Sequence, residues 1–275
     1  MLGRRSTLRP SCERLSDGLA RLSLPSEVTG SGLLSKRGWK WWLSRRILML
    51  AFVIFRRRRH GRLVLEKVRG VPLVVFPGVF HPSLFLSTSL LLDALDQLRL
   101  KADSSVLDLG TGTGICAIFA AMKGAQVTAT DISPVAVRCA KVNVAINDVE
   151  DRVRVVEGDL FLPVEGETFD LVIFNPPYYE GKPRDWPEYA WRGEDVLHRF
   201  AQGLGAHLAK GGSALLSVST ELDLPAIREK LHANGFQVRE VRKRRLPGET
   251  MLVYECARSS AGQPLRSEEL GPAQR

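Results

Sequence analysis

Short apolar runs alternate with longer amphipathic stretches through the middle of the chain. The runs are bounded by Gly, Pro or Asp, which is typical of buried strands. Four such strands are predicted, at 106–109, 126–131, 153–157 and 169–174. The stretches that follow the first two have helical periodicity, over 115–122 and from a Ser133-Pro134 cap to about Ile146. This alternation predicts a parallel sheet with helices on both faces.

A smaller unit precedes this core, over residues 63–104. A hairpin is predicted there from two apolar runs, at 63–65 and 73–76. A turn-rich segment follows, and then a lead-in helix for which we expect Ser87 or Thr88 to be the N-cap. We expect His81, in the turn-rich segment, to be an ordinary loop residue without a catalytic role.

The C-terminal half continues the pattern and ends in an antiparallel pair. The predicted elements are a helix from 193–195 to about 209, a strand at 214–218, a helix at 224–233, and paired strands at 236–242 and 251–256. The basic turn between the last two, 243–248, is expected to be solvated or to contact an acidic partner. The predicted fold is a doubly wound α/β core over 105–258, with a seven-stranded, mostly parallel sheet whose last strand is antiparallel. Residues 259–275 are predicted to be a disordered tail.

The charge of the chain is concentrated in a basic N-terminal extension, residues 1–62. This extension has 15 Lys and Arg against 3 Asp and Glu, whereas residues 63–275 have 24 against 27, giving net charges of +12 and −3. We expect the extension to be partly disordered, with a helix over 39–60. The apolar run 47–55 is too short to span a bilayer, which needs about 20 residues. Residues 36–62 are suited to bind an anionic surface, either RNA or a membrane. Alternatively, they form a helix that packs on the core.

The cysteines and the extension also bear on the compartment of the protein. The four cysteines, at 12, 116, 139 and 256, form no Cys-x-x-Cys pair and have no nearby His at metal-ligand spacing. We therefore predict no disulfide framework and no metal site, which fits a reducing, cytoplasmic compartment. Peripheral association with a membrane and organellar targeting by the Arg- and Ser-rich start remain alternatives.

Candidate chemistry gathers where the predicted strands end. The first strand leads into a glycine loop, Gly110-Thr111-Gly112-Thr113-Gly114, with Asp108 two residues ahead of it. Glycines let a backbone turn sharply and approach a ligand closely. Asp131 ends the second strand, where a carboxylate can accept the two hydroxyls of an adenosine ribose, and Asp159 follows the third. Each acid taken alone could instead be a helix N-cap. A dinucleotide fingerprint would need a third Gly where the chain has Ile115.

The fourth strand ends in Asn175-Pro176-Pro177-Tyr178. Proline has no N–H to donate and a fixed φ, so the chain must leave the sheet there in a stiff turn. The turn holds a polar side chain and backbone carbonyls at the carboxyl end of a strand, where open α/β sheets bind ligands. An aromatic, proline-rich loop follows at 179–192 and is expected to help shape a substrate pocket.

In order and spacing these motifs resemble those of class I S-adenosylmethionine-dependent methyltransferases with an Asn-Pro-Pro-Tyr motif. The segment from Phe80 to Leu95 is similar to the lead-in of HemK-type glutamine methyltransferases and their small-domain relatives, although Ser83, Leu84 and Phe85 replace an acidic residue of that lead-in. The resemblance implies S-adenosylmethionine as the cofactor, bound by Asp108, Gly110, Thr111, Gly112, Gly114, Asp131, Ile132, Asp159, Leu160 and Asn175. It implies a catalytic set of Asn175, Pro176, Pro177 and Tyr178, and a substrate pocket that includes Phe80, Tyr179, Trp186 and Trp191.

The expected reaction is methyl transfer to a planar nitrogen of a macromolecule. The acceptor is either a protein glutamine amide, as in release-factor methylation, or an exocyclic amine of a nucleic-acid base. The net charge of −3 on residues 63–275 weakens the case for nucleic acid unless the basic extension supplies the phosphate contacts. A nicotinamide-dependent oxidoreductase and a non-catalytic binding module are alternatives from other classes, and the oligomeric state is not predicted.

Overall fold

The computed structural model describes residues 62–258 apart from Tyr178, 182–191, Glu194 and Pro247. All structural statements below concern these residues. The predictions for residues 1–61, for Trp186 and Trp191, and for the tail at 259–275 lie outside them.

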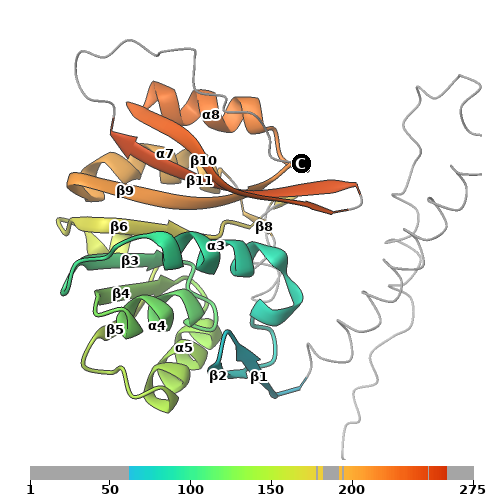
Figure 1. Cartoon of the computed structure of the whole chain (residues 1–275), viewed down its shortest axis with the longest axis vertical. Helices are drawn as coiled ribbons and strands as arrows, with labels where there is room; N and C mark the ends of the chain where they lie inside the picture. Colours follow the sequence, from blue (N-terminus) through green and yellow to red (C-terminus); the bar gives the residue numbers. More distant parts are fainter. Residues whose placement is uncertain (1–61, 178, 182–191, 194, 247, 259–275) are drawn as a thin grey trace, which may run out of the picture. The chain divides into compact units, whose positions relative to one another are not determined.

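The core is a seven-stranded sheet with the order β10-β11-β9-β6-β3-β4-β5 (Figure 1). Its strands are β3 (Ser105–Leu109), β4 (Gln126–Asp131), β5 (Val153–Glu157), β6 (Phe169–Phe174), β9 (Leu208–Ser219), β10 (Phe236–Leu246) and β11 (Glu249–Arg258). The pairs among β9, β6, β3, β4 and β5 are parallel, and β11 runs antiparallel to both of its neighbours. This confirms the predicted fold class.

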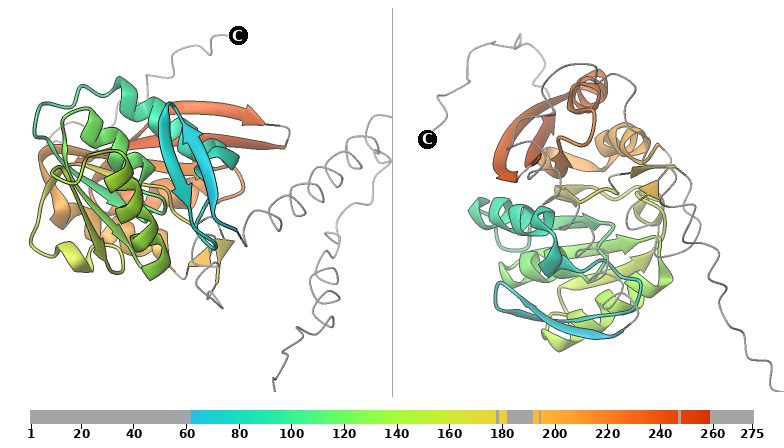
Figure 2. Two further views of the ribbon diagram at one scale, coloured as in Figure 1. Left: turned by 90° about the horizontal axis from the view of Figure 1, so that it is seen from below. Right: turned by 90° about the vertical axis from the view of Figure 1, so that its right-hand side faces the viewer.

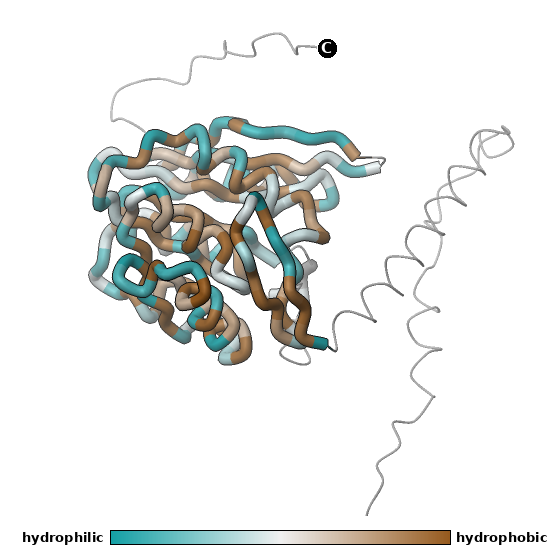
Figure 3. The backbone as a smooth tube through the Cα atoms, turned by 60° about the horizontal axis from the view of Figure 1, so that its bottom comes forward, coloured by the Kyte–Doolittle hydropathy of each residue, from teal (hydrophilic) through white to brown (hydrophobic). Residues whose placement is uncertain are grey.

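Helices cover both faces of the sheet because its central strands are apolar on both sides. In β3, Val106 packs into the core that includes residues of α3 (Leu86–Gln97), α4 (Ile115–Met122) and α5 (Pro134–Ile146). Its neighbour Leu107 packs into the opposite core, under α7 (Val196–His207) and α8 (Leu224–Ala233) (Figure 2). The edge strand β10 is mostly hydrophilic, in contrast to the central strands (Figure 3). A charged edge of this kind discourages pairing with another sheet.

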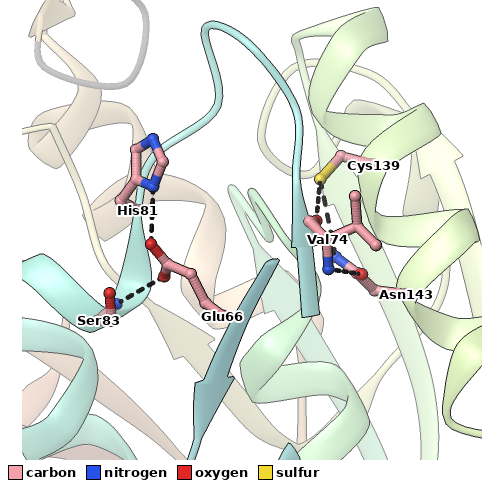
Figure 4. Close-up of polar contacts among 6 residues, drawn as sticks. All are labelled: Glu66, Val74, His81, Ser83, Cys139 and Asn143. Atoms are coloured by element: carbon pink, nitrogen blue, oxygen red, sulfur yellow. Dashed lines mark hydrogen bonds and ion pairs between the residues drawn. The ribbon is translucent and has the colours of Figure 1, made fainter. Parts of the chain in front are cut away.

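A separate hairpin, β1 (Val64–Val68) and β2 (Val71–Val75), lies beside α5 and does not join the main sheet. Apolar side chains of β2 pack into the core, and polar bonds attach the hairpin as well (Figure 4). The Asn143 side chain, 0% exposed, accepts a hydrogen bond from the Val74 N–H at 2.7 Å and donates to the Val74 carbonyl at 2.9 Å. The same amide donates to the Thr113 carbonyl in the glycine loop at 2.8 Å. One buried side chain therefore joins α5, the hairpin and the loop.

The hairpin leads through a short 3-10 helix, η2 (Pro82–Leu84), to the lead-in helix α3. The prediction that Ser87 or Thr88 caps this helix was wrong. The N-cap is Phe85, which makes no side-chain capping bond, and Ser87 and Thr88 lie buried inside the first turn. Helix α3 begins early because its first turn packs against the protein and not against water. Another 3-10 helix, η3 (Leu162–Val164), precedes β6.

Two predicted boundaries near the C-terminus were also wrong. Helix α7 ends at His207, and the Lys210-Gly211-Gly212 sequence, expected to end a helix, lies inside β9. Gly211 has a φ of +82°, and a Cβ on Gly212 would lie 2.8 Å from the Phe169 carbonyl oxygen, so the glycines allow an irregular strand to approach β6 closely. The basic residues 243–246 are part of β10, which leaves only 247 and 248 between the paired strands.

Within the described residues, no helix is both long enough and apolar enough to cross a membrane. Cys116, Cys139 and Cys256 are free thiols and are buried in the protein, where a cysteine packs like a small apolar residue.

We predict that Asn143→Ala lowers the free energy of unfolding by about 3 to 5 kcal/mol, because it removes a side-chain partner from three buried backbone groups at once. Urea unfolding followed by circular dichroism measures this. Asn147→Ala is the control: Asn147 is the C-cap of α5, and its half-exposed side-chain amide donates to the Pro72 carbonyl of the same hairpin and to the Asn143 carbonyl. It should cost about 1 kcal/mol. Equal losses in the two variants would contradict the anchoring role of Asn143.

Candidate functional site

A cavity of about 320 Å³ opens at the carboxyl ends of β3, β4 and β6. Strand β3 pairs with β4 on one side and with β6 on the other, so the chain reverses its direction of winding at this point. In open α/β sheets such a switch point is the usual place for a ligand. The cavity walls come from the glycine loop, the ends of the strands, and the segment between the hairpin and α3.

The glycine loop lies against the cavity in a conformation that other residues adopt with strain. Gly110 and Gly112 have φ values of +61° and +58°, and no atom lies within 4 Å of the place where a Cβ on Gly112 would stand. Both line the cavity, together with Thr111. Gly114, also predicted to bind the cofactor, is not among the residues that line the cavity. Gly114 starts α4, and a Cβ there would lie 3.3 Å from the Ala140 side chain, so it serves close packing against α5.

Asp108 ties the glycine loop to the strand and helix that flank it. Its side chain is nearly inaccessible, with the residue 3% exposed. One carboxylate oxygen accepts hydrogen bonds from the Thr111 hydroxyl at 2.5 Å and from the Ala117 N–H at 3.1 Å. Burial raises the pKa of Asp108 to about 7, with a contribution from the charge of Asp131, although both hydrogen bonds act in the opposite direction. Asp108 therefore shapes the loop and also places a titratable carboxyl at the cavity.

Asp131 ends β4 and also binds backbone groups with both of its oxygens. One accepts from the Gly112 N–H and the other from the Ser133 N–H, each at 2.9 Å. Burial raises the pKa of Asp131 to about 6 in spite of these bonds. A carboxylate has about four lone-pair sites, so each oxygen can still accept a further bond from a ligand hydroxyl. The N-cap of α5 is Ser133, whose hydroxyl accepts from the Ala136 N–H.

Asp159 and Leu160 follow β5 and form another wall of the cavity. Arg199 of α7 forms an ion pair with Asp159, with 2.5 Å between Nη2 and Oδ2. Arg199 also lines the cavity, and its position could not be anticipated because it lies 40 residues away in sequence. Leu160 has a φ of +48°, which is strained for a non-glycine residue. Such strain is found mainly where the surrounding structure imposes it, often at binding sites.

Asn175 leaves β6 beside the glycine-loop strand and lines the cavity with Pro176 and Pro177. Its side-chain amide nitrogen donates to the Ser87 hydroxyl in the first turn of α3, at 3.4 Å. The side chain is neither fully buried nor fully exposed, so it can meet a ligand within the cavity. The predicted catalytic residue Tyr178 lies outside the described residues.

Phe80 provides an aromatic surface across the same cavity. Its ring stacks on that of Phe85, with 4.3 Å between the ring centroids. Tyr179, predicted for the substrate pocket, lies in β7 (Tyr179–Glu180), which pairs with β8 (Arg192–Gly193).

Most of the predicted site residues meet at this cavity. They are Phe80, Asp108, Gly110, Thr111, Gly112, Asp131, Ile132, Asp159, Leu160, Asn175, Pro176 and Pro177. Sequence reasoning missed Gly78, Val79 and Pro82, from the segment between the hairpin and α3, and Thr88, in the first turn of α3. The Pro77-Gly78 turn was the available signal, because a rigid turn just before a helix often builds a binding site.

Comparisons with known proteins agree with this geometry. The model of the family described as "Methyltransferase small domain" matches residues 71–245. A protein of Methanocaldococcus jannaschii is 32% identical over 201 residues, covering 70% of this chain and 98% of that protein, and its name assigns it provisionally as a protein N5-glutamine methyltransferase. The release factor glutamine methyltransferase of Deinococcus radiodurans is 36% identical over 163 residues, covering 54% of this chain.

A solved structure is similar as well. The 16S rRNA N2 G1207 methyltransferase of T. thermophilus, solved with AdoMet and guanosine, matches with a TM-score of 0.53 and 26% identity over 70% of this chain. The chain spans nearly all of the archaeal relative but only 57% of the release factor enzyme and 50% of the rRNA enzyme.

Proposed function

Since the chain belongs to the methyltransferase small domain family, we propose that it transfers a methyl group from S-adenosylmethionine to a planar nitrogen of a macromolecule, with a protein glutamine amide as the favoured acceptor. The observation that carries the proposal is the position of Asn175-Pro176-Pro177 at the same cavity as the glycine loop and the buried acids. A pocket that combines these parts can hold a cofactor and place an amide beside it.

The residues of the cavity fit S-adenosylmethionine. A volume of about 320 Å³ is within the range of roughly 300–1,000 Å³ for small-molecule sites. The open space beside Gly112 admits a ligand close to the backbone. Asp131 keeps lone pairs for ribose hydroxyls, and the ionised acids favour the cationic groups of the cofactor. Asp159 and Leu160 would hold the adenine by a hydrogen bond to its amine and by contact with its ring.

When bound, S-adenosylmethionine supplies an electrophilic methyl group on a sulfonium sulfur. The side-chain carbonyl of Asn175 and the backbone carbonyl of Pro176 would accept the two N–H groups of the acceptor nitrogen. These bonds would direct its lone pair at the methyl carbon. Orientation of this kind contributes up to roughly 7–11 kcal/mol in well-oriented reactions.

Methyl transfer from sulfur to nitrogen needs no oxidant, reductant or other added reagent. The nitrogen lone pair forms the new N–C bond while the electrons of the S–C bond stay on sulfur. The two carbonyls stabilise the positive charge that develops on nitrogen. The product cation then loses one N–H proton to water, so the mechanism assigns no residue as general base. Phe80 would pack against the planar acceptor group.

The proposed class of acceptor is based on what similar proteins are named for. The near full-length match to a protein named for glutamine methylation supports a glutamine amide. A base amine is the second candidate, supported by the match to the rRNA enzyme. Both groups are planar, carry two N–H bonds and have a delocalised lone pair, so both fit the arrangement proposed for Asn175.

The acceptor can be identified in lysate from a strain that lacks this protein, incubated with the purified chain and methyl-labelled S-adenosylmethionine. We expect label in protein, with mass spectrometry locating the methyl group on a glutamine side chain. Label found only on a base amine of RNA would replace the favoured acceptor with the second candidate. Calorimetry with NAD is the control for cofactor class, and tighter binding of NAD than of S-adenosylmethionine would contradict the proposed reaction.

Asn175→Ala should preserve the affinity for S-adenosylmethionine and lower the rate of methyl transfer by on the order of a hundredfold or more, because it removes one of the two proposed acceptors of the substrate N–H groups. Calorimetry measures the affinity, and transfer of label to the macromolecular fraction of the lysate measures the rate. Near-normal transfer by this variant would rule out the proposed mechanism.

The affinity for S-adenosylmethionine should fall at acid pH. Above about pH 7 Asp108 and Asp131 are largely ionised, and they take up protons as the pH falls through about 7 and about 6, respectively. Protonation removes negative charge that favours the cationic cofactor, so the dissociation constant should rise on the order of tenfold between about pH 8 and about pH 5. Asp131→Asn should bind more weakly at pH 8 and show a flatter profile. A dissociation constant that is independent of pH would exclude this role for the carboxylates.

A further inference from the structure

The orientation of the Asn175 amide has a structural cause outside the glycine loop and the strands. An asparagine amide can present either its carbonyl oxygen or its NH₂ group to a ligand, and only the oxygen accepts a hydrogen bond from an acceptor N–H. In this protein the amide nitrogen donates to the Ser87 hydroxyl. With the nitrogen directed at Ser87, the oxygen is directed away from it. The Ser87 hydroxyl could also donate to the oxygen, so what this contact fixes is the place of the Asn175 side chain; in this structure the amide nitrogen takes the contact.

Ser87 is itself held firmly. It lies in the first turn of α3 and is 2% exposed. Its neighbour Thr88 lines the cavity, as does Leu91 one turn later. The position of the Ser87 hydroxyl therefore depends on where α3 begins, and α3 begins directly after the 3-10 helix η2 and Phe85.

A buried hydrogen bond between Glu66 and His81 attaches the start of η2 to the hairpin (Figure 4). The Glu66 carboxylate on β1 lies 2.9 Å from Nδ1 of His81, and the two side chains are only 3% and 2% exposed. The other Glu66 oxygen accepts from the Ser83 N–H in η2 at 3.4 Å. Burial acts to raise the pKa of Glu66, but the hydrogen bonds from His81 and Ser83 outweigh it and lower the pKa. The Glu66 carboxylate is thus ionised at neutral pH and accepts a hydrogen bond from Nδ1–H of His81.

The His81 ring does not act at the cavity. Phe80 and Pro82 line the cavity, whereas His81 between them does not. His81 has extended backbone angles, with φ −88° and ψ 104°, so its side chain points to the opposite side from its neighbours. Its contact with Glu66 faces the hairpin, and a role as a catalytic base is excluded by this direction.

We propose that Ser87 is a positioning residue for Asn175, and that the Glu66–His81 pair holds the segment that sets the place of Ser87. The contacts run from Glu66 to His81 and Ser83, through η2 to the first turn of α3, and from Ser87 to Asn175. The hairpin thereby supports the methyl-acceptor side of the cavity. This inference rests on the proposed function, since it assigns a task to the Asn175 carbonyl.

A double-mutant cycle between Ser87 and Asn175 tests the proposal. The rate is label transfer from S-adenosylmethionine to the macromolecular fraction of the knockout lysate. Ser87→Ala should lower it on the order of tenfold or more, as expected for a misplaced catalytic group. In the Asn175→Ala background the same substitution should change the rate by less than about twofold, because a residue that acts through Asn175 has nothing left to position. Ser87→Thr retains the hydroxyl and should retain most of the rate.

Two further measurements separate positioning from a general loss of structure. The dissociation constant for S-adenosylmethionine and the melting temperature should stay close to those of the unchanged protein in Ser87→Ala. Ser219→Ala is the matched control: it removes another buried hydroxyl that accepts a backbone N–H, at the same edge of the sheet but outside the cavity lining, and should leave the rate unchanged. If Ser87→Ala folds poorly, Ser87→Cys replaces the hydroxyl with a weak acceptor of similar size and carries the same expectation.

Two variants test the role of the Glu66–His81 pair. Glu66→Ala should lower the rate of methyl transfer and leave the affinity for S-adenosylmethionine unchanged. Glu66→Gln keeps an acceptor for His81 and should have a rate between those of Glu66→Ala and the unchanged protein. An equal loss from Ser87→Ala in both Asn175 backgrounds, or no loss in either, would overturn the inference while leaving the proposed function standing. Normal transfer by Asn175→Ala would instead reject the proposed mechanism, so the two failures are distinguishable.

Discussion

Two carboxylates buried at the ends of adjacent parallel strands are the constraint on which the rest of the site depends. Burying an ionised group is costly unless hydrogen bonds compensate for lost water. Here the compensation comes from the glycine loop and the helix starts: Asp108 accepts from Thr111 and Ala117, and Asp131 accepts from Gly112 and Ser133. The loop must therefore close over the strand ends in one arrangement. The residual cost remains visible in the raised pKa values of both acids, about 7 and about 6. A cationic ligand at this cavity would relieve that cost, so the same charges that are expensive in the free protein favour binding.

The second support of the site is the hairpin, which lies outside the main sheet but is bonded to it by buried polar side chains. Asn143 joins β2 to α5 and to the Thr113 carbonyl of the glycine loop, and Glu66 joins β1 to the segment that precedes α3. A buried hydrogen-bond network that leaves polar groups without partners destabilises a protein, whereas a fully bonded network favours a single arrangement of its residues. The hairpin is thus bonded to the glycine loop on one side of the cavity, and we propose that it supports the other side through Ser87. Apolar residues of β2 bury the hairpin against the helices, and the polar contacts define its position.

The sequence predicted those parts of the protein that depend on local pattern. The four central strands, α4 and α5 follow from apolar runs and from glycine and proline signals, and the structure places them within a residue of the expected bounds.

Local pattern gave wrong predictions where the local structure depends on a neighbour far along the chain. The Gly211-Gly212 pair continues a strand because β6 approaches closely there, and α3 starts at an apolar residue because its first turn is buried. Arg199 with Asp159, His81 with Glu66, and Ser87 with Asn175 are contacts between residues 40, 15 and 88 positions apart. Nothing in the flanking sequence of either partner specifies them, so sequence reasoning assigned His81 to an ordinary loop and missed Ser87.

The division between cofactor side and acceptor side also explains why the reaction is easier to infer than the acceptor. The cofactor side is built from the ends of β3, β4 and β5, whose positions follow from the sheet itself. On the acceptor side, the proposal is that Asn175 and Pro176 hold the nitrogen whatever molecule carries it, because a glutamine amide and a base amine present the same planar NH₂ group. Discrimination between them requires contacts beyond that group. Phe80 and Pro82, before α3, are placed to make such contacts, and both belong to the segment held by Glu66 and His81. In the proposed mechanism, contacts outside the sheet would distinguish the two acceptors, and the hairpin proposed to position Asn175 through Ser87 also holds this part of the cavity wall.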